Sequence, residues 1–216
     1  MASWKLKTPI SEEDIRKVKV GDYVYFTGGV WSVGLLQLGG QSKFIAEMYK
    51  NGREKELPFD LKGSAVISGH GHVEQKDGKF HVAYFGFSTA SRLNQEVSHL
   101  VQYAGIRAWM GKGGVGPPYM PGGKDQTNEF LDLFAKYGCI ACTGVGGCAI
   151  TYAPFVKDEK HFWTEKGAHA KVTEVVVENI GPLFVIMDSH HGSRSSEIRQ
   201  NINTQLPLIY KELGIS

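Results

Sequence analysis

Hydrophobic and polar positions follow two different periods along the chain, and the change between them predicts an α/β protein. Runs of β-branched and aromatic residues predict strands at residues 23–26, 64–68, 80–85, 106–110, 171–177 and 184–188, with a further strand and glycine turn within 139–152. Apolar residues three or four apart predict helices at residues 44–49, 91–104, 126–137 and 202–213. Because helices separate most strands while some strands look hairpin-linked, we expect a mixed sheet in one domain over residues 1–216.

Local signals place several boundaries of these elements. Ser11 stands three residues before Asp14, a spacing that predicts an N-capped short helix through Val18. The glycines at residues 28–29 are expected to end the first strand, and Lys-Asp-Gly-Lys at residues 76–79 predicts a hairpin turn.

The charge balance limits the class of ligand. Lys and Arg total 24 against 22 Asp and Glu, a net charge of +2, whereas binding to duplex nucleic acid normally needs a strongly basic domain. We therefore expect no nucleic acid partner. A local cluster of cations around a small anion is still compatible with this composition.

Targeting signals and cysteine usage indicate a compartment. No apolar run approaches the roughly 18 residues of a spanning helix, and the first residues form no signal-peptide core. Cys139, Cys142 and Cys148 lie within ten residues, and an odd number of cysteines in a chain of this length does not indicate a secreted disulfide framework. Their spacing could hold zinc or an iron–sulfur cluster, although apolar neighbours favour buried structural thiols. We expect a soluble, reduced, cytoplasmic protein with no membrane association.

A glycine-rich segment offers a weak nucleotide motif. Residues 111–116 satisfy the GxGxxG pattern after a predicted strand. A phosphate site of this kind needs a helix that begins at the last glycine, but Pro117 and Pro118 follow and no helix is predicted for about ten residues. The segment therefore leaves one candidate, Lys112, a cation between glycines that allow a ligand to approach the backbone.

Four polar residues follow two strands that are expected to end at one edge of the sheet. Ser88 and Thr89 lie between a predicted strand and a predicted helix, where a hydroxyl often serves only as a helix cap. Arg92 lies one turn from Ser88, and Lys112 follows the next strand. Hydroxyl, guanidinium and ammonium groups together suit a dicarboxylate ligand.

Two histidine pairs are weaker candidates. Gly69-His70-Gly71-His72 is read as a loop after a buried strand, and His70 is the member best placed for a ligand. His190 and His191 are adjacent, so their imidazoles make a poor preformed metal site. For both pairs, surface or hydrogen-bonded histidines are the simpler interpretation.

A set of short segments spread over most of the chain carries the strongest functional signal. They are residues 6–15 (LKTPISEEDI), 20–28, 57–63 (LPFDLKG), 86–92, Met-Gly-Lys-Gly at 110–113, Gly-Gly at 146–147 and a late Val-Ile-Met-Asp strand. In this order they resemble the β subunit, or C-terminal domain, of class I fumarate hydratases and L-tartrate dehydratases. The most specific part is the combination of Gly-Lys-Gly with Ser/Thr-x-x-x-Arg.

This resemblance implies a fold, a partner and a reaction. The implied fold is a swivelling β/β/α domain with a mixed sheet. The implied partner is an α subunit that carries the catalytic [4Fe–4S] cluster on its own three cysteines. We therefore expect this chain to work in a hetero-oligomer, and the isolated chain could form a homodimer. The implied reaction is the reversible hydration of a small dicarboxylate, either fumarate/malate or tartrate.

The resemblance also implies roles for the four polar residues. Ser88 matches the first threonine of the family motif, the hydroxyl proposed to take the proton from the carbon next to a carboxylate, and Thr89 matches the second. Arg92 and Lys112 match residues that bind the substrate carboxylates. A serine alkoxide is far too basic to persist in water, so Ser88 needs cations and a dry pocket to lower its pKa.

The chain departs from the family pattern near its first strand. The family has Arg-Asp-x-x-His there, whereas this chain has Val33, Gly34 and Gln37, or with a short insertion Gln37, Leu38 and Gln41. The Arg-Asp pair is missing in either alignment, which leaves the identity of the dicarboxylate open. His70, in place of the usual proline, is a candidate replacement for substrate binding.

Two alternatives to a hydro-lyase subunit follow from the same residues. The missing Arg-Asp pair is compatible with a non-catalytic structural or regulatory member of the fold. The cysteines are compatible with a stand-alone metal-binding protein that uses Cys139, Cys142 and Cys148.

Overall fold

The computed structural model describes most of the chain. The described residues are 1–33, 41–76, 79–118, 120, 122–146, 149–163 and 172–215, without the side chains of residues 70–85 and 149. The expected Gln37 and Leu38 therefore lie outside the described residues, as do Cys148 and the side chain of His70.

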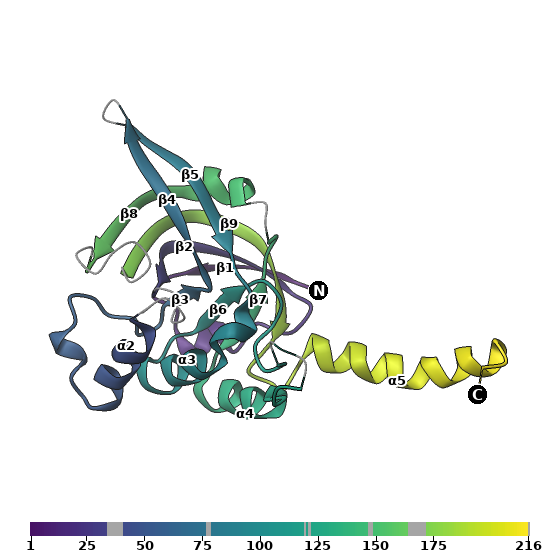
Figure 1. Ribbon diagram of the computed structural model, residues 1–216. Coiled ribbons are helices and arrows are strands. Elements are labelled where there is room, and N and C mark those ends of the chain that lie inside the picture. The colour runs from purple at the N-terminus through teal and green to yellow at the C-terminus, as the bar shows by residue number, and fades with distance from the viewer. Residues whose placement is uncertain are drawn as a thin grey trace.

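A mixed sheet of seven strands forms the centre of the molecule (Figure 1). In spatial order its strands are β1 (Ser3–Lys7), β2 (Tyr23–Ser32), β3 (Ala65–Ile67), β6 (Ala108–Gly111), β7 (Ile140–Thr143), β9 (Val172–Met187) and β8 (Val156–Phe162). The first five are parallel, and β9 runs antiparallel to its neighbours. Because β2 also pairs with β9, the sheet closes on itself. The expected mixed sheet and α/β class are confirmed.

Most of the helical elements cover one face of this sheet, and a separate ribbon rises from it. The helical elements are α1 (Glu12–Ile15), α2 (Ser42–Lys50), η2 (Glu54–Glu56), η3 (Ala90–Leu93), α3 (Asn94–His99), η4 (Leu100–Ala104), α4 (Thr127–Tyr137), η5 (Ala149–Phe155) and α5 (Arg194–Glu212). Figure 1 shows α2, α3 and α4 together below the sheet. It also shows the ribbon of β4 (Gly69–Lys76) and β5 (Lys79–Phe87) extending away from the opposite side.

The alternation of side chains along the strands creates two hydrophobic cores. Trp109 faces the core under the helices, where it lies with Phe130 and Phe134 of α4. The next residue, Met110, faces a second core that it shares with Phe26 of β2. Neighbouring residues of a strand point to opposite faces, so each inner strand contributes to both cores. This double burial explains why the inner strands read as short continuous apolar runs.

Local chemistry confirms two predicted helix ends. The Ser11 side chain accepts a hydrogen bond from the Asp14 backbone N–H at 3.0 Å, so it caps α1 as expected, although α1 ends at Ile15 and not at Val18. Gly138 ends α4 with a φ of 65°, the left-handed conformation that glycine adopts without strain.

Several predicted boundaries are wrong. Strand β2 does not stop at the glycines but continues to Ser32, because Gly28 and Gly29 leave room for the Thr8 and Glu174 side chains. The expected loop at residues 69–72 is the start of β4. The two late strands are one long strand, β9, and the edge strands β1 and β8 went unpredicted.

The C-terminal helix differs from the expectation in place and in surroundings. It begins at Arg194 instead of residue 202, and Pro207 lies within it. None of its side chains is buried, and Figure 1 shows it extending away from the rest of the molecule. Among the described residues, no helix has the length and apolar character needed to cross a membrane.

Candidate active site

Two predicted site segments meet where the parallel strands end. The Ser88 backbone N–H donates to the Ser68 carbonyl at 2.6 Å, directly after β3. The Lys112 N–H donates to the Ser88 carbonyl at 2.8 Å, and the Ala90 N–H donates back to the Lys112 carbonyl at 3.0 Å. These bonds extend the sheet by one more ladder, in which Thr89 pairs with Lys112. The predicted Ser88, Thr89 and Lys112 are therefore brought together.

The Ser88 hydroxyl has a polar partner at the bottom of this edge. Its Oγ lies 3.0 Å from the Oγ of Ser68, which is fully buried, while Ser88 itself is half-buried. The Ser68 hydroxyl also reaches the Thr89 carbonyl, at 3.4 Å. This hydroxyl pair fixes the Ser88 side chain, and either oxygen can be the donor. The single hydrogen of Ser68 can point to the Thr89 carbonyl or to the Ser88 oxygen.

Neither of the predicted hydroxyls caps the following helix. Thr89 occupies the N-cap position of η3, but its side chain makes no capping hydrogen bond, and Ser88 bonds to Ser68 instead. The capping interpretation is therefore wrong for these residues. Their position is explained by the ladder to β3 and Lys112, not by helix initiation.

Glycines allow the backbone segments of the edge to come this close. A Cβ atom on Gly111 would lie 2.8 Å from the Cβ of Ala90, so only glycine fits between β6 and η3 without movement. A Cβ atom on Gly146 would lie 2.5 Å from Cδ of Lys112. The stem of Lys112 thus runs across the bare backbone of Gly146, which guides the ammonium group along this edge.

Positive charge is exposed at the same edge. Lys112 and Arg92 are both exposed, and Arg92 lies on η3, the turn that follows Ser88 and Thr89. One turn further on, Glu96 is buried, and burial raises the pKa of its carboxyl group above the usual value.

This arrangement can bind a carboxylate and activate a hydroxyl. A guanidinium and an ammonium group provide charge-assisted hydrogen bonds to an anion. The same cations favour the ionised form of a nearby hydroxyl, and Ser68 can donate to that form. Yet Lys112 and Arg92 are open to solvent in the single chain, where water screens them. A dry site at this edge requires a second surface to cover it.

The cysteines do not form a ligand set. Cys139 lies in the core under the helices and Cys142 in the other core, so their side chains point to opposite faces of the sheet. Both are buried, and burial raises the pKa of each thiol, which opposes the thiolate form that metals bind. An iron–sulfur cluster does not fit these two residues, and the metal-binding alternative loses its two described ligands.

The remaining predicted residues fall into two groups. His190 and His191 have different partners: the His190 Nε2 lies 2.7 Å from the Arg16 carbonyl and the His191 Nε2 lies 3.2 Å from Asp132. The hydrogen-bonded interpretation of this pair is confirmed. The His70 backbone pairs with Gly86 in the ribbon, so this residue lies in a strand and not in a loop.

One residue of the edge went unnoticed in the sequence. Ser68 reads as the polar end of a buried strand, and its role becomes visible only when β5 returns Ser88 beside it. The available signal was its position: a serine directly after three apolar residues of a central strand lies at the edge where ligands bind in α/β sheets.

Comparison with known proteins shows which family this chain belongs to. The family model described as "Fumarase C-terminus" matches residues 2–197. The chain belongs to the fumarase C-terminus family. This match supports the swivelling β/β/α fold that the sequence motifs led us to expect, and it ends within the first turn of α5.

The relatives in this family carry enzyme-subunit names. A protein of Methanocaldococcus jannaschii, provisionally named L(+)-tartrate dehydratase subunit beta, is 31% identical over 199 residues, which is 91% of this chain and 93% of the relative. The L(+)-tartrate dehydratase subunit beta of Escherichia coli (strain K12) is 26% identical over 193 residues, 89% of this chain and 86% of the relative. A longer Geobacillus stearothermophilus protein, provisionally named fumarate hydratase class I, is 27% identical over 91% of this chain and 34% of its own length. The names are those of hydro-lyases and of their subunits.

Proposed function

We propose that this chain is the β subunit of an iron–sulfur-dependent hydro-lyase that adds water to, or removes it from, a small dicarboxylate. Fumarate/malate and tartrate are the candidate substrates. The observation that carries the proposal is the Ser88 hydroxyl, paired with buried Ser68 at 3.0 Å and locked by the backbone beside Lys112. The names of the family relatives support the reaction class.

In this proposal the chain supplies the base and the carboxylate clamps. The Ser88 oxygen takes the proton from the carbon next to a carboxylate, and Thr89 lines the same turn. Arg92 and Lys112 hold the substrate carboxylates, and they lower the pKa of Ser88 at the same time. When the Ser88 oxygen becomes negative, Ser68 donates its hydrogen to it, and this bond stabilises the reactive form more than the resting one.

The proposal assigns the cluster to a partner. An α subunit carries the [4Fe–4S] cluster, which supplies Lewis acidity toward the substrate hydroxyl. Two observations agree with this division: the described thiols of this chain lie in separate cores, and the polar edge is open to solvent. A covering subunit would exclude water from Ser88. In this drier site the electrostatic interactions of Arg92 and Lys112 with the substrate would be stronger.

Reconstitution tests the proposal directly. The chain is combined under anaerobic conditions with an α subunit of an L(+)-tartrate dehydratase, or with one encoded beside this chain, and hydration of fumarate and dehydration of L-tartrate are measured. The expected result is activity that needs both subunits and is lost in a Ser88→Ala variant. Ser98→Ala serves as the control, because Ser98 is also half-buried but lies on α3, away from the strand ends.

Two results would contradict the proposal. The first is a stable complex with the α subunit that shows no hydro-lyase activity on any small dicarboxylate. This result favours a structural or regulatory member of the fold. The second is an active complex in which Ser88→Ala is as active as the control, which places the base elsewhere.

A further inference from the structure

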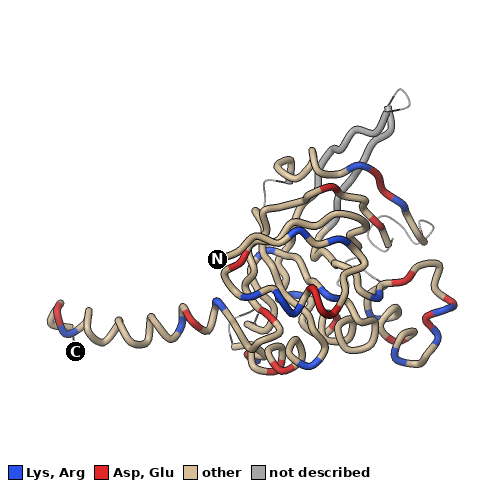
Figure 2. The backbone as a smooth tube through the Cα atoms, turned by 180° about the vertical axis from the view of Figure 1, so that it is seen from behind, with Lys and Arg blue, Asp and Glu red and all other residues tan. Residues whose placement is uncertain are grey.

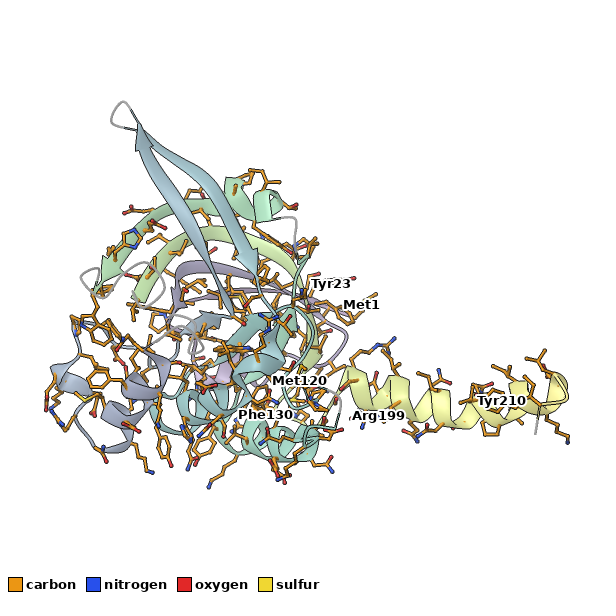
Figure 3. All side chains as sticks on the ribbon, in the orientation of Figure 1. Met1, Tyr23, Met120, Phe130, Arg199 and Tyr210 are labelled. Carbon is orange, nitrogen blue, oxygen red and sulfur yellow. The ribbon has the colours of Figure 1, made fainter. Side chains whose placement is uncertain are left out.

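The helix α5 presents one continuous apolar stripe to solvent. At about 100° per residue, four apolar residues of α5 and Leu213, which caps its C-terminal end, fall within roughly 80° of one another. They are Ile198, Ile202, Leu206, Ile209 and Leu213, and between 39% and 66% of each is exposed. Figure 3 shows the side chains of α5 projecting on all sides with no other element against the helix beyond its base.

Such a helix is poorly supported by its own sequence. From residue 200 to residue 210 it carries no charged side chain, and hence no ion pair between successive turns (Figure 2). Pro207 removes one backbone hydrogen bond from its middle. Most helices of proteins depend on burial of an apolar face, so this helix needs a surface that covers the stripe.

The stripe has the symmetry that pairing with itself requires. Ile198 and Leu213 lie equally far from the point midway between residues 205 and 206, and so do Ile202 and Ile209. Leu206 lies next to this point. In a two-fold contact, residue i of one copy meets residue j of the other and the reverse. Two antiparallel copies therefore place Ile198 against Leu213 and Ile202 against Ile209, with the two Leu206 side chains near the axis.

A groove at the base of α5 fits the end of a second helix. It has a volume of about 200 Å³ and mostly apolar walls, formed among others by Val115, Ile186 and Ile198. Because Ile198 belongs to both the groove and the stripe, the apolar surface is continuous. In an antiparallel pair the C-terminal turn of one helix ends at the base of the other, so Leu213 of the second copy reaches this groove.

The size of the surface also suits a specific contact. A helix of 19 residues is about 28 Å long. Two such stripes and the two grooves together offer on the order of 1,000 Å² of buried surface, near the lower bound for a specific interface. The uncharged middle of α5 brings no like charges together in this arrangement.

We propose that α5 is a dimerisation helix, which pairs antiparallel with α5 of a second copy of this chain. The family match ends at residue 197, so nearly all of the stripe lies outside the shared domain. The inference does not depend on the proposed function, because no residue of the stripe has a proposed catalytic role, although the groove at its base is lined in part by Gly113, the residue after Lys112.

The mass of the full chain in solution tests this pairing. Sedimentation equilibrium is expected to show a dimer for the natural chain and a monomer for Ile202→Glu and Ile209→Glu, with the dissociation constant raised at least about 100-fold. The matched controls, Gln200→Glu and Thr204→Glu, add the same charge on the opposite side of α5 and are expected to stay dimeric. A thermal unfolding curve for each variant confirms that the domain is folded.

Cross-linking tests the direction of the pair. Chains with Ile202→Cys mixed with chains with Ile209→Cys are expected to form a disulfide, whereas either variant alone is not, since its thiols lie about 10 Å apart. Cross-linking of each variant alone would show a parallel pair and overturn the proposal. A natural chain that is monomeric would also overturn the proposal. If in addition Ile202→Glu breaks a complex with an α subunit, the stripe binds that subunit and not a second copy of this chain.

Discussion

The strand edge around Ser88 and the helix α5 are both exposed in the single chain, but they expose opposite kinds of side chain. The edge presents hydroxyls and cations on a backbone held by several cross-strand hydrogen bonds. Helix α5 presents an apolar stripe and projects from the body. In our two proposals these surfaces therefore take different partners: an anion and a covering subunit at the edge, and an apolar helix at α5.

The two regions also differ in how firmly they are built. Ser88 is fixed from both sides, by β3 through Ser68 and by β6 through Lys112. Beyond its first turns α5 has no neighbour among the described residues, and its charged anchor is one ion pair, from Arg199 to Asp125 at 2.8 Å. Rigid placement suits chemistry at a defined atom, whereas a projecting element suits association.

The largest effect is expected at Ser88. If its oxygen is the base, Ser88→Ala lowers kcat of the assembled enzyme by about 10²–10⁴-fold, the usual contribution of proton transfer. Steady-state assays of hydration measure this kcat, and Ser98→Ala is expected to stay within about twofold of the natural chain. A loss in both variants would point to damage to the fold instead of loss of the base.

The next largest effect is expected at Lys112. In the proposed mechanism Lys112 binds the carboxylate and favours the ionised serine, so for Lys112→Ala we expect kcat/KM to fall about 100-fold through a lower kcat and a higher KM together. Lys124→Ala is the control, since Lys124 is exposed and pairs with Glu129. A variant of Lys112 that changes only KM would contradict the second of its two roles.

Ser68 is expected to act through Ser88. In the proposed mechanism Ser68 donates to the ionised Ser88 oxygen. We therefore expect Ser68→Ala to lower kcat about tenfold and to move the rise of kcat with pH to higher pH, because the ionised serine loses a donor. Ser64→Ala is the control, because Ser64 is also a buried serine and its hydroxyl has no hydrogen-bond partner among the described residues. An unmoved pH profile would reduce Ser68 to a packing role.

A smaller effect is expected at Gly146. Gly146→Ala places a methyl group 2.5 Å from Cδ of Lys112, and the flexible lysine stem is the part that moves. We expect kcat/KM to fall several-fold, roughly 1 kcal/mol in transition-state binding, with little change in the free energy of unfolding. Gly114→Ala is the matched control, because its methyl group would make an ordinary contact with Ile186 at 3.4 Å.

The smallest effect is expected where α5 is anchored. Hydrogen bonds from Thr127 and Arg199 lower the pKa of Asp125 to about 2. A lowered folded-state pKa stabilises the protein fully above the unfolded value near 4, and this stabilisation is lost as pH falls toward 2. Because the pair is partly exposed, Asp125→Asn is expected to cost less than about 1 kcal/mol at pH 7. Urea unfolding across this pH range, with Arg199→Gln to complete a double-mutant cycle, measures the interaction.

The elements that the sequence predicts well are those in which several local signals agree. Helix α4 combines an apolar period with Gly138 at its end. The hairpin of β4 and β5 was marked by its turn residues, although β4 begins earlier than expected. The edge strands β1 and β8 were not predicted. Most of their exposed residues are charged, and a short segment rich in charged residues is typical of a loop.

In the candidate site too, residues marked by local sequence patterns were predicted, whereas a contact between distant segments was not. Ser88, Thr89, Arg92 and Lys112 were predicted from strand ends and motifs, and the structure brings the backbones of three of them into one ladder. The partner of Ser88 could not be predicted, because Ser68 meets it only through the path of β4 and β5 out of the sheet and back. The full apolar face of α5 was not predicted either, because the expected helix began only at residue 202 and so left out Ile198.

The most direct test of the central claim separates proton removal from substrate binding at Ser88. The assembled enzyme is incubated in D₂O with malate or tartrate, whichever it dehydrates, and exchange at the carbon–hydrogen bond next to the carboxylate is followed by NMR, alongside calorimetric binding. We predict that Ser88→Ala binds the substrate within about threefold of the natural chain but loses the exchange. Exchange at the natural rate in Ser88→Ala would contradict the account.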